Sequence, residues 1–365
     1  MRSALRIGQQ AAVPLVAILL GFVVAGVAVA ITGADPTQAY LGLFQGAFTN
    51  KHALTESLIA SIPYVFLGLA VATGFRAGLF NIGADGQFYL GALGGVFVGF
   101  SLHGLPGIVH IPLAILAGIV CGAAYGGLPG FLKARFGAHE VITTIMLNYI
   151  AYSLSDYLIN HGPLGDRHAS APKTPFIAAS AQLPIIYPDS RLHLGLLLAL
   201  VAVPLLWFLI ERTTTGFRIR AVGLNSEAAR SSGISVARTI VLVMAISGGL
   251  AGLAGADEVL GVSHFMPPSF SIGYGFDAIA VALLARSNPW AILPSAFLFG
   301  AMRNGAGFMQ LQTQVSADMI SIVQATVIMF VAAPMIVRWL LRLRAVPGES
   351  LQITQHEGTG ASPEP

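Results

Sequence analysis

Charged residues are scarce in this sequence: Asp, Glu, Lys and Arg make up only 10% of its 365 residues, whereas hydrophobic residues make up 55%. The mean hydropathy of +0.76 lies far from that of a water-soluble domain. This composition excludes an ordinary soluble protein and predicts that lipid surrounds most of the chain. Membrane lipid is therefore the first expected partner.

Cysteine and lysine are also rare. The single cysteine, Cys121, lies within the apolar stretch 111–131, so no intrachain disulfide can form. The only lysines are Lys51, Lys133 and Lys173, and none stands in the Gly-Lys-Ser/Thr sequence of a phosphate-binding loop. The chain is therefore not expected to hydrolyse ATP by that route, and we expect no enzymatic activity.

The nine histidines show no spacing typical of a metal site. His161, His168 and His193 lie far apart in or beside one loop, and His139-Glu140 has no further ligands nearby. Paired nucleophile and base residues, which an intramembrane enzyme needs, are not evident either. We therefore expect neither a metal nor a cofactor.

Long apolar stretches predict an all-α fold, a polytopic transmembrane helix bundle of about ten spans, because an α-helix needs about 20 apolar residues to cross the bilayer. Two of the spans are short, and one is broken near 83–87. The candidate spans are 11–31, 57–75, 79–102, 111–131, 141–159, 193–210, 239–256, 276–286, 289–302 and 318–341. The first is longer than the apolar core of a signal peptide, so we expect it to be retained. The 42 glycines fit helices that pack closely in lipid.

The basic residues indicate the orientation of these spans. If both termini are cytoplasmic, 14 of the 19 Lys and Arg residues fall in cytoplasmic segments, as the positive-inside rule requires. The exceptions are Lys51, Arg167, Lys173, Arg191 and Arg303. The chain is therefore expected in the cell (inner) membrane, with N- and C-termini cytoplasmic. Because its basic residues are scattered at helix ends, no nucleic-acid partner is expected.

Two loops interrupt the expected membrane domain, 1–345, which is followed by a polar tail, 346–365, that we expect to be disordered. The outer loop, 160–192, contains five prolines and should be irregular but stiff. It either contacts a protein that delivers the solute or has no partner role. The cytoplasmic loop, 211–238, is rich in positive charge and small residues.

Each half of the chain contains an interrupted apolar region rich in Gly, Asn and Pro, at 79–102 and at 276–302. Paired breaks of this kind often flank a transport pathway. In the first break, Asn81, Asp85 and Gln87 place two amides and a carboxylate at membrane depth. A buried carboxylate costs a few kcal/mol unless it is paired or hydrated, so such residues are usually functional. The alternative is a structural cap on a neighbouring helix end.

The fifth span carries a polar stripe. Thr144, Asn148, Tyr152 and Asp156 recur every four residues, which places them on one helix face, expected to point into the bundle. Asn148 and Tyr152 could hold a sugar or a base, but hydrogen bonds between helices explain them as well. The predicted substrate pathway therefore consists of Asn81, Asp85, Gln87, Asn148 and Tyr152.

Three further acidic residues, Asp257, Glu258 and Asp277, lie near expected helix ends, where solvated capping is the simpler explanation. Arg286, which precedes Asn288-Pro289, is expected to mark an inner turn.

The segment 225–233 predicts a short capped helix within the cytoplasmic loop. Asn225 or Ser226 can cap its N-terminus, and Glu227 suits the positive end of the helix dipole. Arg230 suits the negative end, and Gly233 can adopt the left-handed closing conformation. Such a helix either serves as a rigid point of attachment or merely shortens the loop.

The pattern Glu227-Ala228-Ala229 followed by Gly233 resembles the EAA-x-x-x-G core of ABC-importer permeases. Three longer blocks resemble the sugar and nucleoside branch (branched-chain/ribose-type) of these permeases, at 78–87, 215–252 and 273–284. The residues that follow the glycine in the general motif are absent here, so assignment to the branch depends on these blocks. The sequence 81–87, Asn-Ile-Gly-Ala-Asp-Gly-Gln, is most similar to nucleoside-type permeases.

The resemblance implies a transmembrane permease subunit that imports a small polar solute, most simply nucleosides. It implies three partners: ABC ATPase subunits, a substrate-binding protein, and a second permease subunit that completes a homo- or heterodimer. ATPase coupling would involve Arg218, Arg220, Asn225, Glu227, Ala228, Ala229, Arg230 and Gly233. The alternatives are a simple-sugar (ribose-like) permease and an ion-driven secondary transporter, which would not need the loop 211–238.

Overall fold

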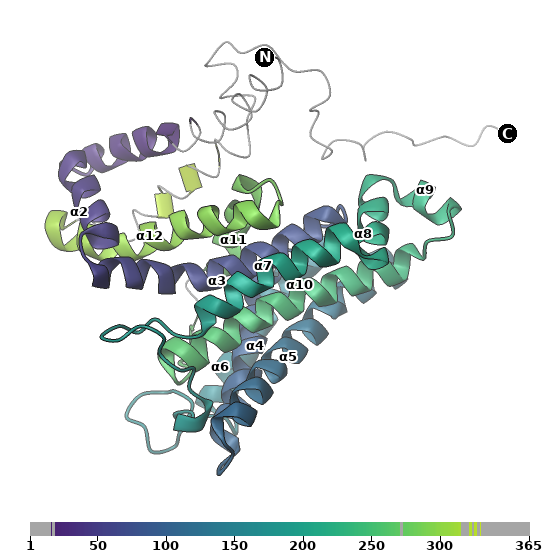
Figure 1. Ribbon diagram of the computed structural model, residues 1–365, viewed down its shortest axis with the longest axis horizontal. Coiled ribbons are helices and arrows are strands. Elements are labelled where there is room, and N and C mark those ends of the chain that lie inside the picture. The colour runs from purple at the N-terminus through teal and green to yellow at the C-terminus, as the bar shows by residue number, and fades with distance from the viewer. Residues whose placement is uncertain are drawn as a thin grey trace.

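The computed structural model describes residues 16, 19–270, 273–314, 321–322, 325–326 and 329. In this part of the chain the structure is all-α, with one isolated β-bridge between Ile185 and His193, which confirms the predicted fold class. The helices are α2 (Pro36–Phe48), α3 (Lys51–Arg76), α4 (Ala84–Ser101), α5 (Gly107–Phe136), α6 (Glu140–Asn160), α7 (Gly195–Arg212), α8 (Thr214–Leu224), α9 (Ser226–Ser231), α10 (Val236–Glu258), α11 (Tyr274–Leu284) and α12 (Pro289–Thr313) (Figure 1). A 3-10 turn, η1 (Ala179–Ala181), and a π-helix, η2 (Val259–Ser263), complete the described elements.

Four helical segments are long and apolar enough to cross a membrane: Lys51–Arg76, Gly107–Phe136, Gly195–Arg212 and Val236–Ser263. Three of them contain the predicted spans 57–75, 111–131 and 239–256, and Gly195–Arg212 covers 193–210 except for its first two residues. The predicted spans 79–102, 141–159, 276–286 and 289–302 overlap α4, α6, α11 and α12, although α4 begins five residues later than predicted and α12 continues eleven residues further. The start of the span 11–31, the whole tail and most of 318–341 lie outside the described residues, so the count of ten stays a prediction.

Helix α2 was not predicted from the sequence. Asp35 caps it by accepting a hydrogen bond from the Thr37 backbone N–H (2.8 Å), and Pro36 occupies its first turn. This Asp-Pro pair is a recognised helix-start signal, but the 13-residue helix that follows it is too short to form a long apolar stretch. Helix α2 buries Ala39 and Leu43 against α12, and Figure 1 shows the two helices side by side.

Glycines bring α4, α5 and α10 into close contact at the centre of the bundle. A Cβ atom added to Gly126 of α5 would lie 2.6 Å from the carbonyl oxygen of Met244 and 2.8 Å from the Cα of Gly248, both on α10. One to two turns away, Gly91 of α4 and Gly122 of α5 both abut Gly252 of α10. In lipid, dispersion between backbones at this separation drives helix association.

We expect Gly126→Ala to destabilise the bundle, because the new methyl group must push α5 away from α10, and such overpacking costs about 1–3 kcal/mol. The matched control is Gly127→Ala on the same helix, where the nearest atom to an added Cβ is 4.0 Å away. Thermal unfolding of the purified protein in detergent should show a lower Tm for Gly126→Ala alone. Equal Tm values for the two variants would contradict this account of the core.

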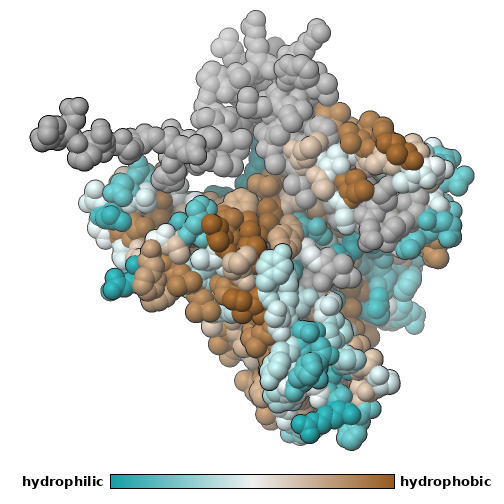
Figure 2. Space-filling model, turned by 180° about the vertical axis from the view of Figure 1, so that it is seen from behind, coloured by the Kyte–Doolittle hydropathy of each residue, from teal (hydrophilic) through white to brown (hydrophobic). Residues whose placement is uncertain are grey.

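The outer faces of several spans carry apolar side chains suited to lipid. On α5, Ile108, Leu116 and Phe131 are more than half exposed, and on α7 so are Leu205 and Phe208. Figure 2 shows broad apolar areas through the middle of the molecule and the most hydrophilic residues at its lower tip and sides. This distribution matches a multi-pass membrane protein.

Candidate transport lane and coupling loop

The chain between α3 and α4 turns back into the bundle, so that α4 begins among buried polar side chains. Asn81 holds this break: its Oδ1 accepts from the Gly83 backbone N–H (3.0 Å), and its Nδ2 donates to Ser247 Oγ (2.8 Å) and to Gln87 Oε1 (2.9 Å). Ser247 lies about 16 Å along α10 from its start, at ~1.5 Å per residue. The first break therefore lies deep in the bundle.

Asn148 of α6 supports the same break from the other side. Its Oδ1 accepts from the Gly86 backbone N–H (2.8 Å), and its Nδ2 donates to the carbonyl oxygen of Ile82 (2.9 Å). One amide therefore pairs a donor and an acceptor that the broken helix leaves without intrahelical partners.

Asp85 joins the two interrupted regions predicted from the sequence. Its Oδ2 accepts from the hydroxyl of Tyr152 (2.5 Å), and its Oδ1 accepts from the Gly275 backbone N–H (2.8 Å) in the first turn of α11. A Cβ atom on Gly275 would lie 2.5 Å from the Cα of Asp85, so α4 and α11 begin in contact. A carboxylate between two helix N-termini is stabilised by both helix dipoles.

All five residues of the predicted pathway therefore lie in one cluster. Asn81, Asp85, Gln87 and Asn148 are at most 2% exposed, and Tyr152 is half-buried. We call Asn81, Asp85, Gln87, Asn148 and Tyr152 the break cluster. It holds the helix break together, and its part in transport stays a prediction.

Asp156, the last member of the polar stripe, does not point into the bundle as predicted. It is exposed and accepts a hydrogen bond from the side chain of Asn160 (2.8 Å), whereas Thr144 and Asn148 are buried. The buried face of α6 runs through Thr144, Asn148, Ala151, Ser155 and Ile159. Because a helix has about 3.6 residues per turn, a four-residue spacing drifts by about 40° per step, and by Asp156 it has left this face.

A second polar cluster lies beside the break cluster and was not recognised from the sequence. The hydroxyl of Tyr64 donates to Asp277 Oδ2 (2.8 Å) and accepts from Arg303 Nη1 (3.2 Å). Arg303 is 3.8 Å from Asp277 Oδ2, and its guanidinium lies 4.1 Å from the ring centre of Tyr274. We call Tyr64, Tyr274, Asp277 and Arg303 the arginine cluster. Ionisable residues inside spans are the signal that could have identified it.

Two expectations for acidic residues and one for Arg303 were wrong. Asp277 is not a solvated cap, because Tyr64 and Arg303 partner it within the bundle. Asp257 is 1% exposed and lies 3.9 Å from His193 Nδ1, because the outer loop covers the end of α10. Arg303 belongs to no external loop, since α12 continues to Thr313 rather than ending near 302.

The outer loop is attached to the bundle along much of its length. Backbone N–H groups of Ile177 and Leu183 donate to the carbonyl oxygens of His264 and Leu260, both at 2.9 Å. At the end of the loop, Arg191 forms two hydrogen bonds with Glu56, which raise the pKa of the guanidinium above its ordinary value. The loop is thus irregular but anchored, as the prolines predict.

The cytoplasmic loop contains the predicted short helix. Asn225 caps α9 by accepting from the Ala228 backbone N–H (2.9 Å). Gly233 adopts φ +80°, and its N–H donates to the carbonyl oxygen of Arg230 (2.9 Å). On the exposed face, Glu227 lies 3.7 Å from Arg230. Figure 1 places α9 at one extremity of the molecule, beyond the start of α10.

Arg220 and Arg218, both predicted to take part in coupling, have different surroundings. Arg220 bonds to the carbonyl oxygen of Ile210 and is 3.1 Å from Glu211 Oε2. The other oxygen of Glu211 is 3.1 Å from Arg76, which also donates to the carbonyl oxygen of Ser287 (3.1 Å). This network, the Glu211 bracket, ties α8 to α3, α7 and the turn before α12. That turn contains Arg286, as predicted.

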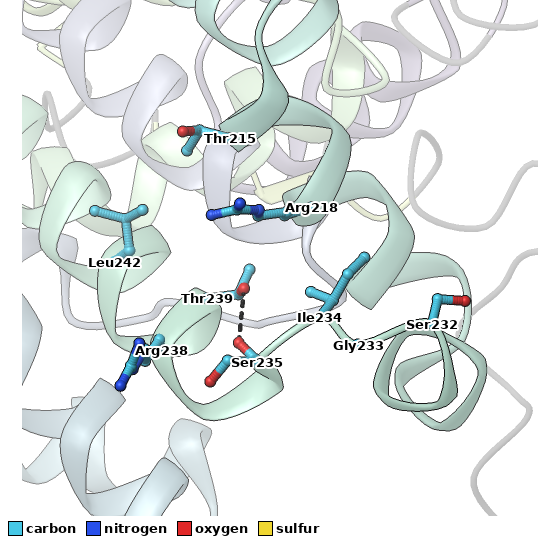
Figure 3. Close-up of a pocket in the computed structure, with 9 residues that line it drawn as sticks. All are labelled: Thr215, Arg218, Ser232, Gly233, Ile234, Ser235, Arg238, Thr239 and Leu242. Carbon is cyan, nitrogen blue, oxygen red and sulfur yellow. Dashed lines mark hydrogen bonds between the residues drawn. The ribbon is translucent and has the colours of Figure 1, made fainter.

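Arg218 instead lines a pocket of about 400 Å³ beside α9. The lining residues are Thr215, Arg218, Ser232, Gly233, Ile234, Ser235, Arg238, Thr239 and Leu242 (Figure 3). Figure 3 shows the Arg218 side chain extending across the pocket above Thr239. Among the described residues, no carboxylate within 4 Å neutralises Arg218 or Arg238. The surface next to α9 is therefore concave and positively charged.

Broken helices that meet at buried polar groups, in a bundle with lipid-facing spans, define a membrane transport protein. The chain belongs to the family described as branched-chain amino acid transport system / permease component, which it matches over residues 53–332. A permease component is the membrane-embedded part of its system, so ATP hydrolysis and substrate capture belong to separate ATPase and substrate-binding subunits.

Three curated relatives extend over most of the chain. It is 39% identical to the guanosine ABC transporter permease protein NupP of Bacillus subtilis, covering 90% of this chain and 95% of that one. It is 35% identical to the nucleoside ABC transporter permease protein NupB of Lactococcus lactis, covering 90% and 92%. It is 34% identical to the glucose ABC transporter permease protein TsgB13 of Haloferax volcanii, covering 87% and 86%. No solved structure matches the chain.

Proposed function

We propose that this chain is the permease subunit of an ABC importer that carries nucleosides through the bundle at the break cluster. The observation that carries the proposal is the meeting of α4 and α11 at Asp85, flanked by aromatic rings. Helix N-termini, a carboxylate and aromatic faces together suit a solute that has hydroxyl groups and a planar base. The names of the two nucleoside relatives support the same solute class.

Coupling to ATP would pass through α9. An ATPase that docks on α9 and the adjoining positive pocket would move α8, and the Glu211 bracket connects α8 to the end of α3 and to the turn at Ser287. That turn ends α11, whose other end contacts Asp85. A continuous set of packed contacts therefore joins the docking helix to the break cluster.

The orientation and assembly follow from charge and from the class of transporter. Basic residues gather at the end of the bundle that carries α9, including Arg76, Lys133, Arg220 and Arg238, so we assign this end to the cytoplasm. Both termini would then be cytoplasmic. A second permease subunit, either another copy or a related chain, would complete the pathway.

A sugar permease is the second candidate, because the glucose relative is nearly as similar as the nucleoside relative. Uptake of labelled guanosine, adenosine, ribose and glucose should be compared in cells that carry the whole transporter with and without this subunit. We expect uptake of nucleosides, dependent on the subunit and on ATP. Uptake of sugars alone would support the second candidate.

An ion-driven carrier is the remaining alternative. The purified chain, reconstituted alone in vesicles under a proton or sodium gradient, should not accumulate nucleosides. Accumulation without any ATPase would refute the importer proposal.

A further inference from the structure

Six aromatic rings form a continuous row between the break cluster and the arginine cluster. The ring centres of Tyr152 and Tyr89 are 4.8 Å apart, and Tyr89 lies 6.2 Å from Phe270. Phe270 stacks on Phe88 at 5.4 Å, Phe88 lies 5.8 Å from Tyr274, and Tyr274 lies 5.2 Å from Tyr64. These rings come from α3, α4, α6, α11 and the segment before α11. Tyr64, Phe88 and Tyr89 are buried, whereas Tyr152, Phe270 and Tyr274 are partly exposed. The partly exposed rings offer a planar base aromatic surface on which to stack.

The two charged side chains of the arginine cluster remain partly accessible inside this aromatic surrounding. The side chains of Arg303 and Asp277 are 21% and 22% exposed, whereas Tyr64, which bonds to both, is fully buried. Tyr64 therefore holds Arg303 and Asp277 in place on their buried side, and part of each charged side chain stays accessible. A charged pair kept accessible within a bundle usually faces a hydrated path.

The chemistry of the pair fits one edge of a particular kind of base. An arginine guanidinium presents two parallel N–H donors, which match the adjacent O6 and N7 acceptors of a 6-oxopurine. A carboxylate next to it can accept from the ring N1–H, which adjoins O6. Adenine presents an amino group in place of O6 and an unprotonated N1. An arginine N–H donor would then face the amino donor, and the carboxylate acceptor would face the N1 acceptor.

We propose that Arg303 and Asp277 select nucleosides with a 6-oxopurine base, such as guanosine and inosine, over adenosine and cytidine. Tyr274, which already lies beneath the guanidinium, provides the stacking face. Tyr64 is a positioning residue. This inference rests on the proposed nucleoside function and adds the residues that set its specificity.

Inosine and adenosine provide a matched test, because they share the ribose and the purine skeleton and differ at the edge in question. Uptake of each should be measured with the complete transporter carrying wild-type or variant permease. We expect wild type to prefer inosine, and Arg303→Lys, which keeps the charge but loses the two-pronged donor, to reduce the inosine-to-adenosine ratio by about tenfold. Asp277→Asn, whose amide can donate to N1 of adenine, should shift the ratio in the same direction.

The control is Arg191→Lys, which alters an arginine that also pairs with a carboxylate, Glu56, but at the outer loop. It should leave the ratio unchanged. If Arg303→Lys and Asp277→Asn lower the uptake of both nucleosides equally, the cluster is structural only and the inference is wrong. Lack of inosine preference in the wild type would also overturn it. Uptake of neither nucleoside by the wild type would instead refute the proposed function.

Discussion

Replacement of Gly233 by proline is expected to abolish nucleoside uptake while the protein still inserts into the membrane at normal levels. Proline fixes φ near −65°, but Gly233 has φ +80°. Proline also removes the N–H that donates to the carbonyl oxygen of Arg230. The end of α9 must therefore unwind or change direction, and the docking surface is displaced. Uptake should fall at least about a hundredfold, since the distortion costs about 3 kcal/mol or more and about 1.4 kcal/mol corresponds to tenfold.

The matched control is Gly233→Asn, because asparagine tolerates the left-handed conformation better than other side chains and keeps the N–H. No atom lies within 4 Å of a Cβ at this position. This variant should retain most of the uptake and of the solute-stimulated ATPase activity. If Gly233→Pro transports normally, α9 does not transmit work from an ATPase.

Replacement of Asp85 by alanine should also eliminate uptake, and it should reduce stability as well. The carboxylate accepts from the Tyr152 hydroxyl and from the Gly275 backbone N–H, so its removal leaves one half-buried and one buried donor without these acceptors. Each orphaned donor costs about 1–3 kcal/mol. We expect a lower Tm in detergent and uptake below about a tenth of wild type, since 1.4 kcal/mol corresponds to tenfold.

A double variant tests whether this bond is the cause. In Asp85→Ala the Tyr152 hydroxyl has lost its acceptor, so Asp85→Ala combined with Tyr152→Phe should unfold at a higher temperature than Asp85→Ala alone. Asp156→Ala, which changes an exposed aspartate, should behave like wild type. Additive losses in the double variant would show that Asp85 acts independently of Tyr152.

The features predicted from the sequence are those that depend on short stretches of chain. The helix α9 with its Asn225 cap and Gly233 terminus is confirmed, because capping needs residues only a few positions apart. Both apolar regions are interrupted as predicted, because clustered Gly, Asn and Asp in an apolar stretch cannot all face lipid. The first break lies at 77–83, however, and the predicted position 83–87 falls largely in the first turn of α4. Asn148 and Tyr152 meet the first break because a four-residue spacing places them on one face of α6.

The features that were missed depend on which helices become neighbours. Nothing within α12 shows that Arg303 lies next to Asp277 and Tyr64. Both Arg303 and Asp277 are more than 200 positions from Tyr64 in the chain. The different surroundings of Arg218 and Arg220 follow from contacts with Glu211, not from the loop sequence. Likewise, the outer loop covers Asp257, which local sequence cannot indicate.

Composition, apolar spacing and capping residues alone determined that this chain forms membrane helices and that the apolar regions containing α4 and α11 are interrupted. They also determined that α9 lies between the sixth and seventh predicted spans. Only the tertiary structure decided that Asp85 links two helix starts and that an arginine lies over a tyrosine beside it. The physical reason is range: helix formation and capping act over a few residues, whereas glycine contacts between distant helices determine which buried polar groups meet.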